Sequence, residues 1–363
     1  MNVFDLVANN KIKTIGRTYF KDSQLFMNFS GTGVRFYINS NKLMINLTGT
    51  KVDIENSRPF VSLLIDDYRY DYAIDKLDYK IELALSQGKH LIQLIKRTES
   101  SVSFCAIKEI VADEFIELEE DKRLKIEFYG DSLTCGFGNL SECCDDPFKT
   151  ETESFLEGYA YLVSKALDAS YSAVCVSGFP VYKSRWNEGF PIDSVADMLS
   201  ITDYSEDMTF NTVIPWDNSQ YIPDLVVVNL GANDHSYFTE GMAWIDELIK
   251  KYGDIKLIEN NEIYLKEIDN LKIKINQFLD NLINLYGNNL KVVWCLFDIY
   301  FEDGILYNII KNQVLNYSKN TYFCDISFKT NVRGAAWHPG RVMHQEAAEL
   351  LTKFIQKILK AEV

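Results

Sequence analysis

The sequence lacks the features that would place it in several familiar classes of protein. Its seven cysteines are odd in number and form no disulfide framework, so their usage favours a reducing compartment. Cys143 and Cys144 are adjacent instead of spaced as a CxxC pair, which argues against a zinc site. With only four histidines, the chain has few candidates for an imidazole base. We expect neither a metal nor an organic cofactor.

Long apolar runs and excess positive charge are also missing. No run approaches the roughly 18 apolar residues that a membrane helix needs. The first residues lack the basic region and apolar stretch of a secretory leader, so we expect a cytoplasmic protein, or a secreted one if a leader has been trimmed. The net charge of −15 opposes binding to nucleic acid and to anionic membranes. Neutral glycans and small esters carry no such penalty.

The two halves of the chain follow different patterns. Residues 1–113 hold short alternating runs separated by Gly and Asn, which predicts an antiparallel β-sandwich. We interpret the charged stretch 114–123 as a linker. Across 124–363, apolar strand-like runs alternate with helical patterns, which predicts a parallel sheet covered by helices in an α/β domain. The strands of this second half are expected at 124–129, 169–176, 224–230, 290–297 and 320–327, and its main helices at 157–168, 265–285, 304–316 and 341–359.

A serine follows the first expected strand of the second half. In Gly130-Asp131-Ser132 the strand ends at the carboxyl edge of the sheet, where open α/β sheets bind their ligands. Serine is a weak nucleophile and needs a neighbouring base. Ser132 is thus a candidate nucleophile, and the alternative is that Asp131 or Ser132 only caps the following helix.

A histidine in a loop before the last helix could be that base. His338 precedes Pro339, which fixes the backbone and keeps the histidine outside the helix. His90 lies in a strand-like run of the first half, His235 follows an Asn-Asp pair, and His344 is expected to pack or cap within the last helix. We predict His338 as the general base, although a lone histidine before a proline is often structural.

Two further strand ends carry groups that can stabilise an oxyanion. Gly178, in Val176-Ser177-Gly178-Phe179, would let its backbone N–H approach a ligand closely. Asn233, in Gly231-Ala232-Asn233-Asp234, carries an amide that could donate to a developing negative charge. Each motif alone is explained as a turn. Three at strand ends, with a histidine before the last helix, favour a catalytic site.

This set resembles the motif blocks of the SGNH/GDSL hydrolase superfamily over roughly residues 125–363. The resemblance implies a flavodoxin-like three-layer α/β/α domain with Ser132 as nucleophile and His338 as base. It also implies an oxyanion hole formed by Ser132, Gly178 and Asn233. Many members carry Asp three residues before the histidine, where this chain has Ala335. We therefore predict a Ser-His dyad oriented by a backbone carbonyl, and a carboxylate from elsewhere in the fold is the alternative.

A closer resemblance covers the whole chain. The first half is similar to the jelly-roll module of carbohydrate esterase family 2, in Ile15-Gly16-Arg17, Ser30-Gly31-Thr32-Gly33 and His90–Arg97. Phe128–Gly138 and Trp337-His338-Pro339 are similar to the catalytic blocks of that family. The resemblance implies a serine esterase, of the acetyl xylan or mannan esterase type, that removes O-acetyl groups from plant cell-wall polysaccharides or their oligosaccharides through an acetyl-enzyme intermediate. An acetylated carbohydrate is thus the expected partner.

Other functions are compatible with the same residues. The missing Asp near His338 leaves a non-catalytic carbohydrate-binding protein with a degenerate hydrolase domain as one alternative. A lipase or thioesterase of the GDSL type is another, and it would need a long apolar acyl channel. Trp337 beside His338, and Trp186 or Trp216 in loops, could stack on a sugar ring, but we favour packing beneath loops. An exposed sandwich face could support a homo-oligomer, and the sequence leaves the oligomeric state open.

Overall fold

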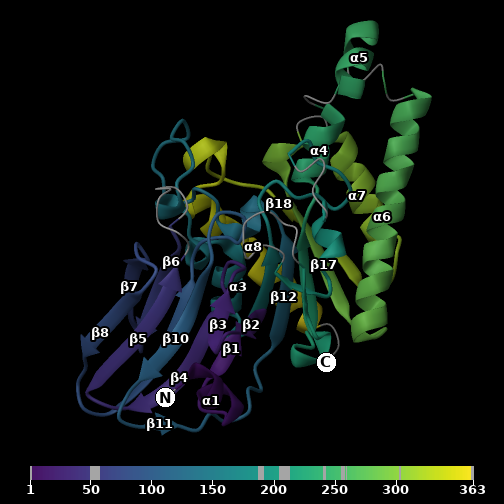
Figure 1. Ribbon diagram of the computed structural model, residues 1–363. Coiled ribbons are helices and arrows are strands. Elements are labelled where there is room, and N and C mark those ends of the chain that lie inside the picture. The colour runs from purple at the N-terminus through teal and green to yellow at the C-terminus, as the bar shows by residue number, and fades with distance from the viewer. Residues whose placement is uncertain are drawn as a thin grey trace.

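A computed structural model describes residues 2–49, 58–186, 192–203, 213–239, 243–254, 258, 260–301 and 304–360. A β-rich half and a mixed half lie side by side in it (Figure 1). Within the described residues, no helix is both long enough and apolar enough to span a membrane.

The first half is an antiparallel sandwich of two sheets. One sheet has the order β1-β4-β9-β6-β7, with β11 also pairing β4, and the other has the order β2-β3-β10-β5-β8. In β5 every second residue is buried, which is the pattern of a strand with one face on a core. The bounds are β1 Lys13–Ile15, β2 Thr18–Lys21, β3 Gln24–Met27, β4 Gly33–Asn39, β5 Lys42–Gly49, β6 Phe60–Ile65, β7 Tyr68–Ala73, β8 Tyr79–Ala84, β9 Lys89–Lys96, β10 Cys105–Val111 and β11 Phe115–Ile116. A short helix, α1 (Val3–Ala8), contacts β3 and β10.

The second half is built on a parallel sheet of five strands. Their order is β13-β12-β16-β17-β18, which is the 2-1-3-4-5 order of flavodoxin-like folds. The bounds are β12 Lys125–Gly130, β13 Ser170–Cys175, β16 Leu225–Asn229, β17 Lys291–Phe297 and β18 Thr321–Ile326. Every residue of β16 is buried because helices cover both faces of the sheet. The predicted fold class, a β-sandwich followed by an α/β domain, is confirmed.

Helices cover the two faces of the parallel sheet in pairs. Helix α3 (Tyr159–Ala166) contacts α8 (Arg341–Lys360) on one face, and α6 (Glu262–Tyr286) contacts α7 (Ile305–Leu315) on the other. Alternate strand residues therefore belong to separate cores: Val227 packs with α3 and α8, whereas Val228 packs with α6 and α7. Within the described residues, the other elements are α2 Ser132–Cys135, α4 Ala232–Thr239, α5 Ala243–Tyr252, β14 Ile201–Asp203, β15 Ile214–Pro215 and six short 3-10 helices.

The sandwich and the α/β domain meet through a buried ion pair. Arg17, from the turn between β1 and β2, is fully buried and donates to Glu127 Oε1 over 2.9 Å. The same guanidinium donates to the carbonyls of Met198 and Ile201, each over 2.8 Å, and to the Tyr129 hydroxyl over 2.7 Å. Such a network is costly to interrupt, because removing one partner leaves a charge buried without compensation.

A cavity of about 590 Å³ also lies between the two domains. Its lining includes Lys125 and Ser170, the first residues of β12 and β13, together with Arg35 and Asp66 of the sandwich. This is the amino end of the parallel sheet. Ligand sites of open α/β sheets lie at the carboxyl ends of the strands, and all four predicted site residues lie outside this cavity.

Candidate active site

Ser132 begins α2 at a sharp turn after β12. Asp131 caps this short helix, and its Oδ1 accepts from the N–H of Leu133 over 3.0 Å. A Cβ at Gly130 would lie 1.9 Å from Thr134 Oγ1, so only glycine allows the chain to turn this tightly. The turn places the Ser132 side chain at the carboxyl edge of the sheet.

The structure brings Ser132 and His338 together across 206 residues of sequence. Their Oγ and Nε2 atoms lie 2.9 Å apart. His338 Nδ1 lies 3.0 Å from the carbonyl oxygen of Ala336, which can only accept a hydrogen bond. In a neutral imidazole Nδ1 therefore carries the proton, and Nε2 is left to accept from the serine hydroxyl. No carboxylate is among the hydrogen-bond partners of His338 within the described residues.

A left-handed turn presents the Ala336 carbonyl to the imidazole. Ala336 and Trp337 have φ of 49° and 63°, a conformation that non-glycine residues adopt rarely. Three backbone N–H groups hold the turn: Ala335 donates to Gly138 over 3.0 Å, Ala336 to Asp146 over 3.0 Å and Trp337 to Cys144 over 3.2 Å. Main-chain carbonyls of the loop around Cys144 and Asp146 thus fix the turn that carries His338. The amino-acid composition of that loop does not indicate this role.

An aromatic stack supports the other side of the imidazole. The rings of Phe137 and His338 have centroids 4.4 Å apart, and Phe137 stacks on Phe148 at 3.9 Å. Burial lowers the pKa of His338 to about 4, and the nearby charge of Arg333 acts in the same direction. The imidazole is therefore neutral at neutral pH, which is the state a general base requires.

Two backbone N–H groups that follow the neighbouring strands β12 and β13 have no acceptor among the described residues. One belongs to Ser132 itself, at the start of α2, and the other to Gly178 in the loop after β13. Gly178 has φ of 81°, and a Cβ there would lie 3.2 Å from Cβ of Trp186. Unpaired N–H groups beside a nucleophile are the donors that a tetrahedral oxyanion needs.

Asn233 reaches the same region but its amide is already engaged. Its Nδ2 donates to Asp131 Oδ2 over 3.0 Å and to the carbonyl of Phe179 over 3.2 Å. Both amide hydrogens therefore have acceptors. The sequence predicted Asn233 as an oxyanion donor but did not indicate these two contacts. Burial also raises the pKa of Asp131 to about 7.

Asp234, the residue after Asn233, holds the loop that follows Gly178. Its buried carboxyl accepts from the N–H groups of Val181 over 2.9 Å, Tyr182 over 2.8 Å and Lys183 over 3.2 Å. Burial raises its pKa to about 6. The sequence analysis assigned no role to Asp234. Its position beside Asn233 at the end of a strand was the one feature that could have indicated a role.

The other three histidines lie outside the site. His90 of β9 pairs its Nδ1 with Asp66 Oδ2 at 2.7 Å. His344 is buried in α8 and its Nδ1 accepts from the N–H of Tyr159 over 3.3 Å, so it packs within the helix as expected. His235 lies in α4 with its ring centroid 5.3 Å from that of Phe301.

Two tryptophans flank the site at its surface. Trp186 and Trp337 are 60% and 57% exposed, so packing beneath loops is wrong for both. It is correct for Trp216, which is buried with Arg17 5.7 Å from its ring centroid. Exposed rings next to Gly178 and His338 form a surface on which a sugar could stack.

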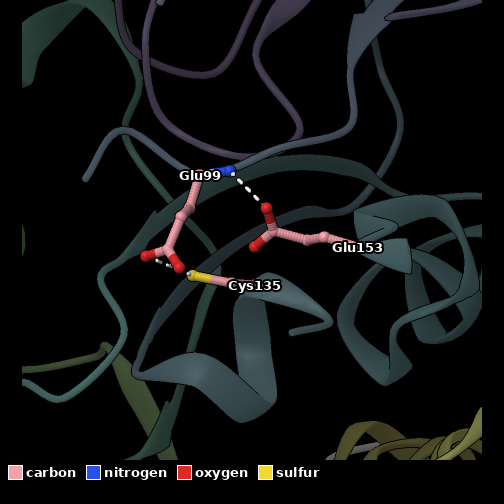
Figure 2. Close-up of side chains that lie close together, drawn as sticks. All are labelled: Glu99, Cys135 and Glu153. Carbon is pink, nitrogen blue, oxygen red and sulfur yellow. Dashed lines mark hydrogen bonds between the residues drawn. The ribbon is translucent and has the colours of Figure 1, made fainter. Parts of the chain in front are cut away.

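One group of side chains among the described residues could hold a metal ion. Potential ligand atoms of Glu99, Cys135 and Glu153 lie within 4.8 Å of one another, and all three residues are buried (Figure 2). Burial raises the pKa values of Cys135 and Glu153 well above their ordinary ranges, which favours their protonated forms. The group lies behind the loop that carries Gly178, because Glu99 Oε2 accepts from the N–H of Ser177 over 2.8 Å.

Comparison with family models assigns the two halves separately. Residues 126–351, more than half of the chain, match the model of the GDSL-like lipase/acylhydrolase family. Residues 14–118 match the model of the carbohydrate esterase 2 N-terminal domain.

Two of the curated relatives match the chain over somewhat less than half of its length. A cellulase/esterase CelE from Acetivibrio thermocellus is 32% identical over 161 residues, covering 43% of this chain and 19% of the relative. An acetylxylan esterase/glucomannan deacetylase from Cellvibrio japonicus is 33% identical over 167 residues, covering 44% of each. The alignments thus span less than half of either relative.

A solved structure matches the chain over nearly its full length. A family two carbohydrate esterase from Clostridium thermocellum, in complex with cellohexaose, superposes with a TM-score of 0.78. The match covers 96% of this chain and 99% of that one at 20% identity, which supports the shared fold. The two family models show that this chain belongs to the GDSL-like lipase/acylhydrolase family and carries the N-terminal domain of carbohydrate esterase 2.

Proposed function

We propose that the chain is a serine esterase that removes O-acetyl groups from plant cell-wall polysaccharides or their oligosaccharides. The observation that carries the proposal is the 2.9 Å separation of Ser132 Oγ and His338 Nε2, with Nδ1 occupied by the Ala336 carbonyl. A serine hydroxyl within proton-transfer reach of a neutral imidazole is the arrangement that activates this nucleophile.

The reaction begins when Ser132 Oγ attacks the ester carbonyl and His338 Nε2 takes its proton. The N–H groups of Ser132 and Gly178 donate to the oxyanion, and each such donor is worth about 2.7–4 kcal/mol in other acyl-transfer enzymes. Asn233 becomes a third donor if the oxyanion displaces one of its present acceptors, of which Phe179 is the more distant. His338 then protonates the leaving sugar hydroxyl, and water activated by the same imidazole releases acetate.

The substrate class is supported by the relatives and by the surface of the site. The curated relative from Cellvibrio japonicus is an acetylxylan esterase/glucomannan deacetylase. Trp186, which lies against Gly178, and Trp337, which precedes His338 in the chain, add exposed aromatic surface. The net charge of −15 is compatible with a neutral glycan.

Labelling with a serine-reactive phosphonate tests the nucleophile directly. We expect one label per chain in the unaltered protein and none in Ser132→Ala. An unlabelled wild-type protein would favour the non-catalytic carbohydrate-binding alternative.

Comparison of substrates then tests the acyl group and the glycan. Aryl acetate should be cleaved faster than aryl octanoate, whereas the reverse order would favour a lipase or thioesterase. Acetate release from acetylated xylan and from acetylated glucomannan, measured side by side, identifies the preferred polysaccharide.

A further inference from the structure

The loop that carries Gly178 is held at two points by carboxyl groups from different domains. Asp234 of the α/β domain binds three N–H groups that follow Gly178. Glu99, from the segment between β9 and β10 of the sandwich, binds the N–H of Ser177, which immediately precedes Gly178. We propose that Glu99 is a positioning residue of the oxyanion hole, supplied by the sandwich domain and acting through Ser177. This inference rests on the proposed function.

The main chain of Glu99 is itself fixed on both sides. Its N–H donates to Glu153 Oε2 over 3.1 Å (Figure 2). Its carbonyl accepts from the buried ammonium of Lys96 over 3.0 Å, which also donates to the carbonyls of Asn28 over 2.8 Å and Thr98 over 2.5 Å. The carboxyl group is therefore presented from a rigid turn, which allows it to set the position of a partner.

The carboxyl of Glu99 meets Ser177 in a dry environment. Glu99 and Glu153 are fully buried, and one oxygen of each, Oε1, has no hydrogen-bond partner among the described residues. The other oxygen of Glu99 accepts from Ser177 N–H over 2.8 Å and from the Cys135 thiol over 3.8 Å. A buried hydrogen bond to a charged or polar acceptor is strong and directional, so it restrains the peptide next to the Gly178 N–H.

Cys135 and Glu153 surround the same carboxyl group of Glu99. Burial favours protonated Cys135 and Glu153, and the buried ammonium of Lys96 lies close enough to Glu153 to affect its pKa. The thiol proton then has an acceptor in Glu99 Oε2. Glu99 Oε2 thus accepts from both the Cys135 thiol and the Ser177 N–H, and the position of this one oxygen is what the proposal requires.

Two substitutions separate the position of the acceptor oxygen from the presence of a carboxyl group. Glu99→Gln keeps an oxygen at the same reach but replaces the carboxyl by an amide, whereas Glu99→Asp keeps the carboxyl and withdraws the acceptor by one carbon–carbon bond. We expect Glu99→Asp and Glu99→Ala to lower kcat on an aryl acetate by about 10- to 100-fold, which is less than the 10²–10³-fold loss for removing an oxyanion donor. KM should change little, because the lost stabilisation belongs to the transition state. Glu99→Gln should retain most of the wild-type kcat.

Rates are expressed per active site, counted by the end-point of phosphonate labelling, so that misfolded protein does not count. The matched control is Glu127→Gln, because Glu127 is also a buried carboxyl that joins the two domains but it contacts Arg17 and not the oxyanion loop. This control should lower the melting temperature without lowering kcat per labelled site.

Four results would overturn the positioning role of Glu99. They are an unchanged kcat per site in Glu99→Asp, a loss in Glu99→Gln as large as in Glu99→Asp, an equal loss in Glu127→Gln, or a stoichiometric metal in the purified protein that disappears with Glu99→Ala. Ser132→Ala, assayed in parallel, keeps the two proposals apart. If Ser132→Ala retains activity, the esterase proposal fails. If Ser132→Ala is inactive and Glu99→Asp is fully active, only the positioning role fails.

Discussion

The base and the oxyanion loop lie on two sides of Ser132 and are held by different parts of the chain. The imidazole of His338 is fixed within the α/β domain, by the Ala336 carbonyl and the ring of Phe137. The loop of Gly178 is held by Asp234 of the same domain and also by Glu99 of the sandwich. The sandwich has its own hydrophobic core, yet it contacts the oxyanion loop through the segment that carries Glu99. Because the two sides are held by different contacts, substitutions should be able to change proton transfer and oxyanion binding separately.

The largest effect is expected on the side of the base, from Ser132→Ala. Loss of the nucleophile should reduce kcat on an aryl acetate by on the order of 10⁶-fold, as for nucleophile knockouts in other serine hydrolases. The melting temperature should stay close to that of the wild type, because the hydroxyl contributes one hydrogen bond at the rim of the fold. Steady-state kinetics and a thermal melt check both expectations, and substantial residual turnover would contradict the role of Ser132.

Replacement of Arg17 at the domain interface should instead lower stability and leave turnover unchanged. Arg17→Met leaves Glu127 buried without its partner, which should lower the free energy of unfolding by about 3–5 kcal/mol. Urea denaturation measures this loss, and kcat per labelled site should be unchanged. Lys42→Met is the matched control, because the Lys42–Asp113 pair has side chains 65% and 46% exposed, and such pairs contribute about 0–1 kcal/mol. Equal losses in the two variants would show that burial of the Arg17 pair adds nothing.

A third effect concerns pH and belongs to the side of the base alone. Because burial lowers the pKa of His338 to about 4, the imidazole stays neutral as pH falls through 6.5 and becomes protonated only near 4. The acid limb of kcat/KM should therefore have an apparent pKa near 4, with a tenfold loss per pH unit below it. A pH–rate profile on an aryl acetate checks this prediction. A limb near 6.5 would mean that the imidazole is not desolvated.

The smallest effect is expected beside the oxyanion loop, from Trp186→Ala. An exposed ring that stacks on a sugar contributes about 1 kcal/mol, so KM for acetylated polysaccharide should rise by a few fold. Turnover of a small aryl acetate should not change, because that substrate has no sugar to stack. Trp216→Ala is the contrasting variant: Trp216 is buried against Arg17, so its loss should reduce stability instead.

The sequence predicted those parts of the fold that depend on local pattern. The alternation in β5 shows that one face of that strand is covered, and the near-continuous apolar run of β16 shows that both of its faces are. Helix α4 was not predicted, because it begins inside the polar Ala232-Asn233-Asp234 stretch and carries little amphipathic pattern. The contact of Ser132 with His338 was anticipated from the strand ends and from the family resemblance.

Contacts that join distant segments by single residues were beyond prediction. Arg17 and Glu99 are ordinary charged residues in the sequence, and nothing in their neighbours shows that both become fully buried. The occupied amide of Asn233 depends on where the Phe179 carbonyl lies, which is set by tertiary packing. Such features follow from the assembled fold and not from periodicity or composition.

The left-handed turn at Ala336 determines which substitutions can disturb the orientation of His338. Since the imidazole is oriented by a main-chain carbonyl, no side-chain substitution at position 336 removes the orienting group itself. If position 336 is replaced by every other amino acid, turnover should therefore follow how well each residue tolerates positive φ, and not the chemical nature of its side chain. Gly, Asn and Asp, which tolerate positive φ, should preserve turnover, whereas Val, Ile and Pro should abolish it. The group that orients His338 would thus be preserved by the backbone conformation at position 336, whatever the side chain there.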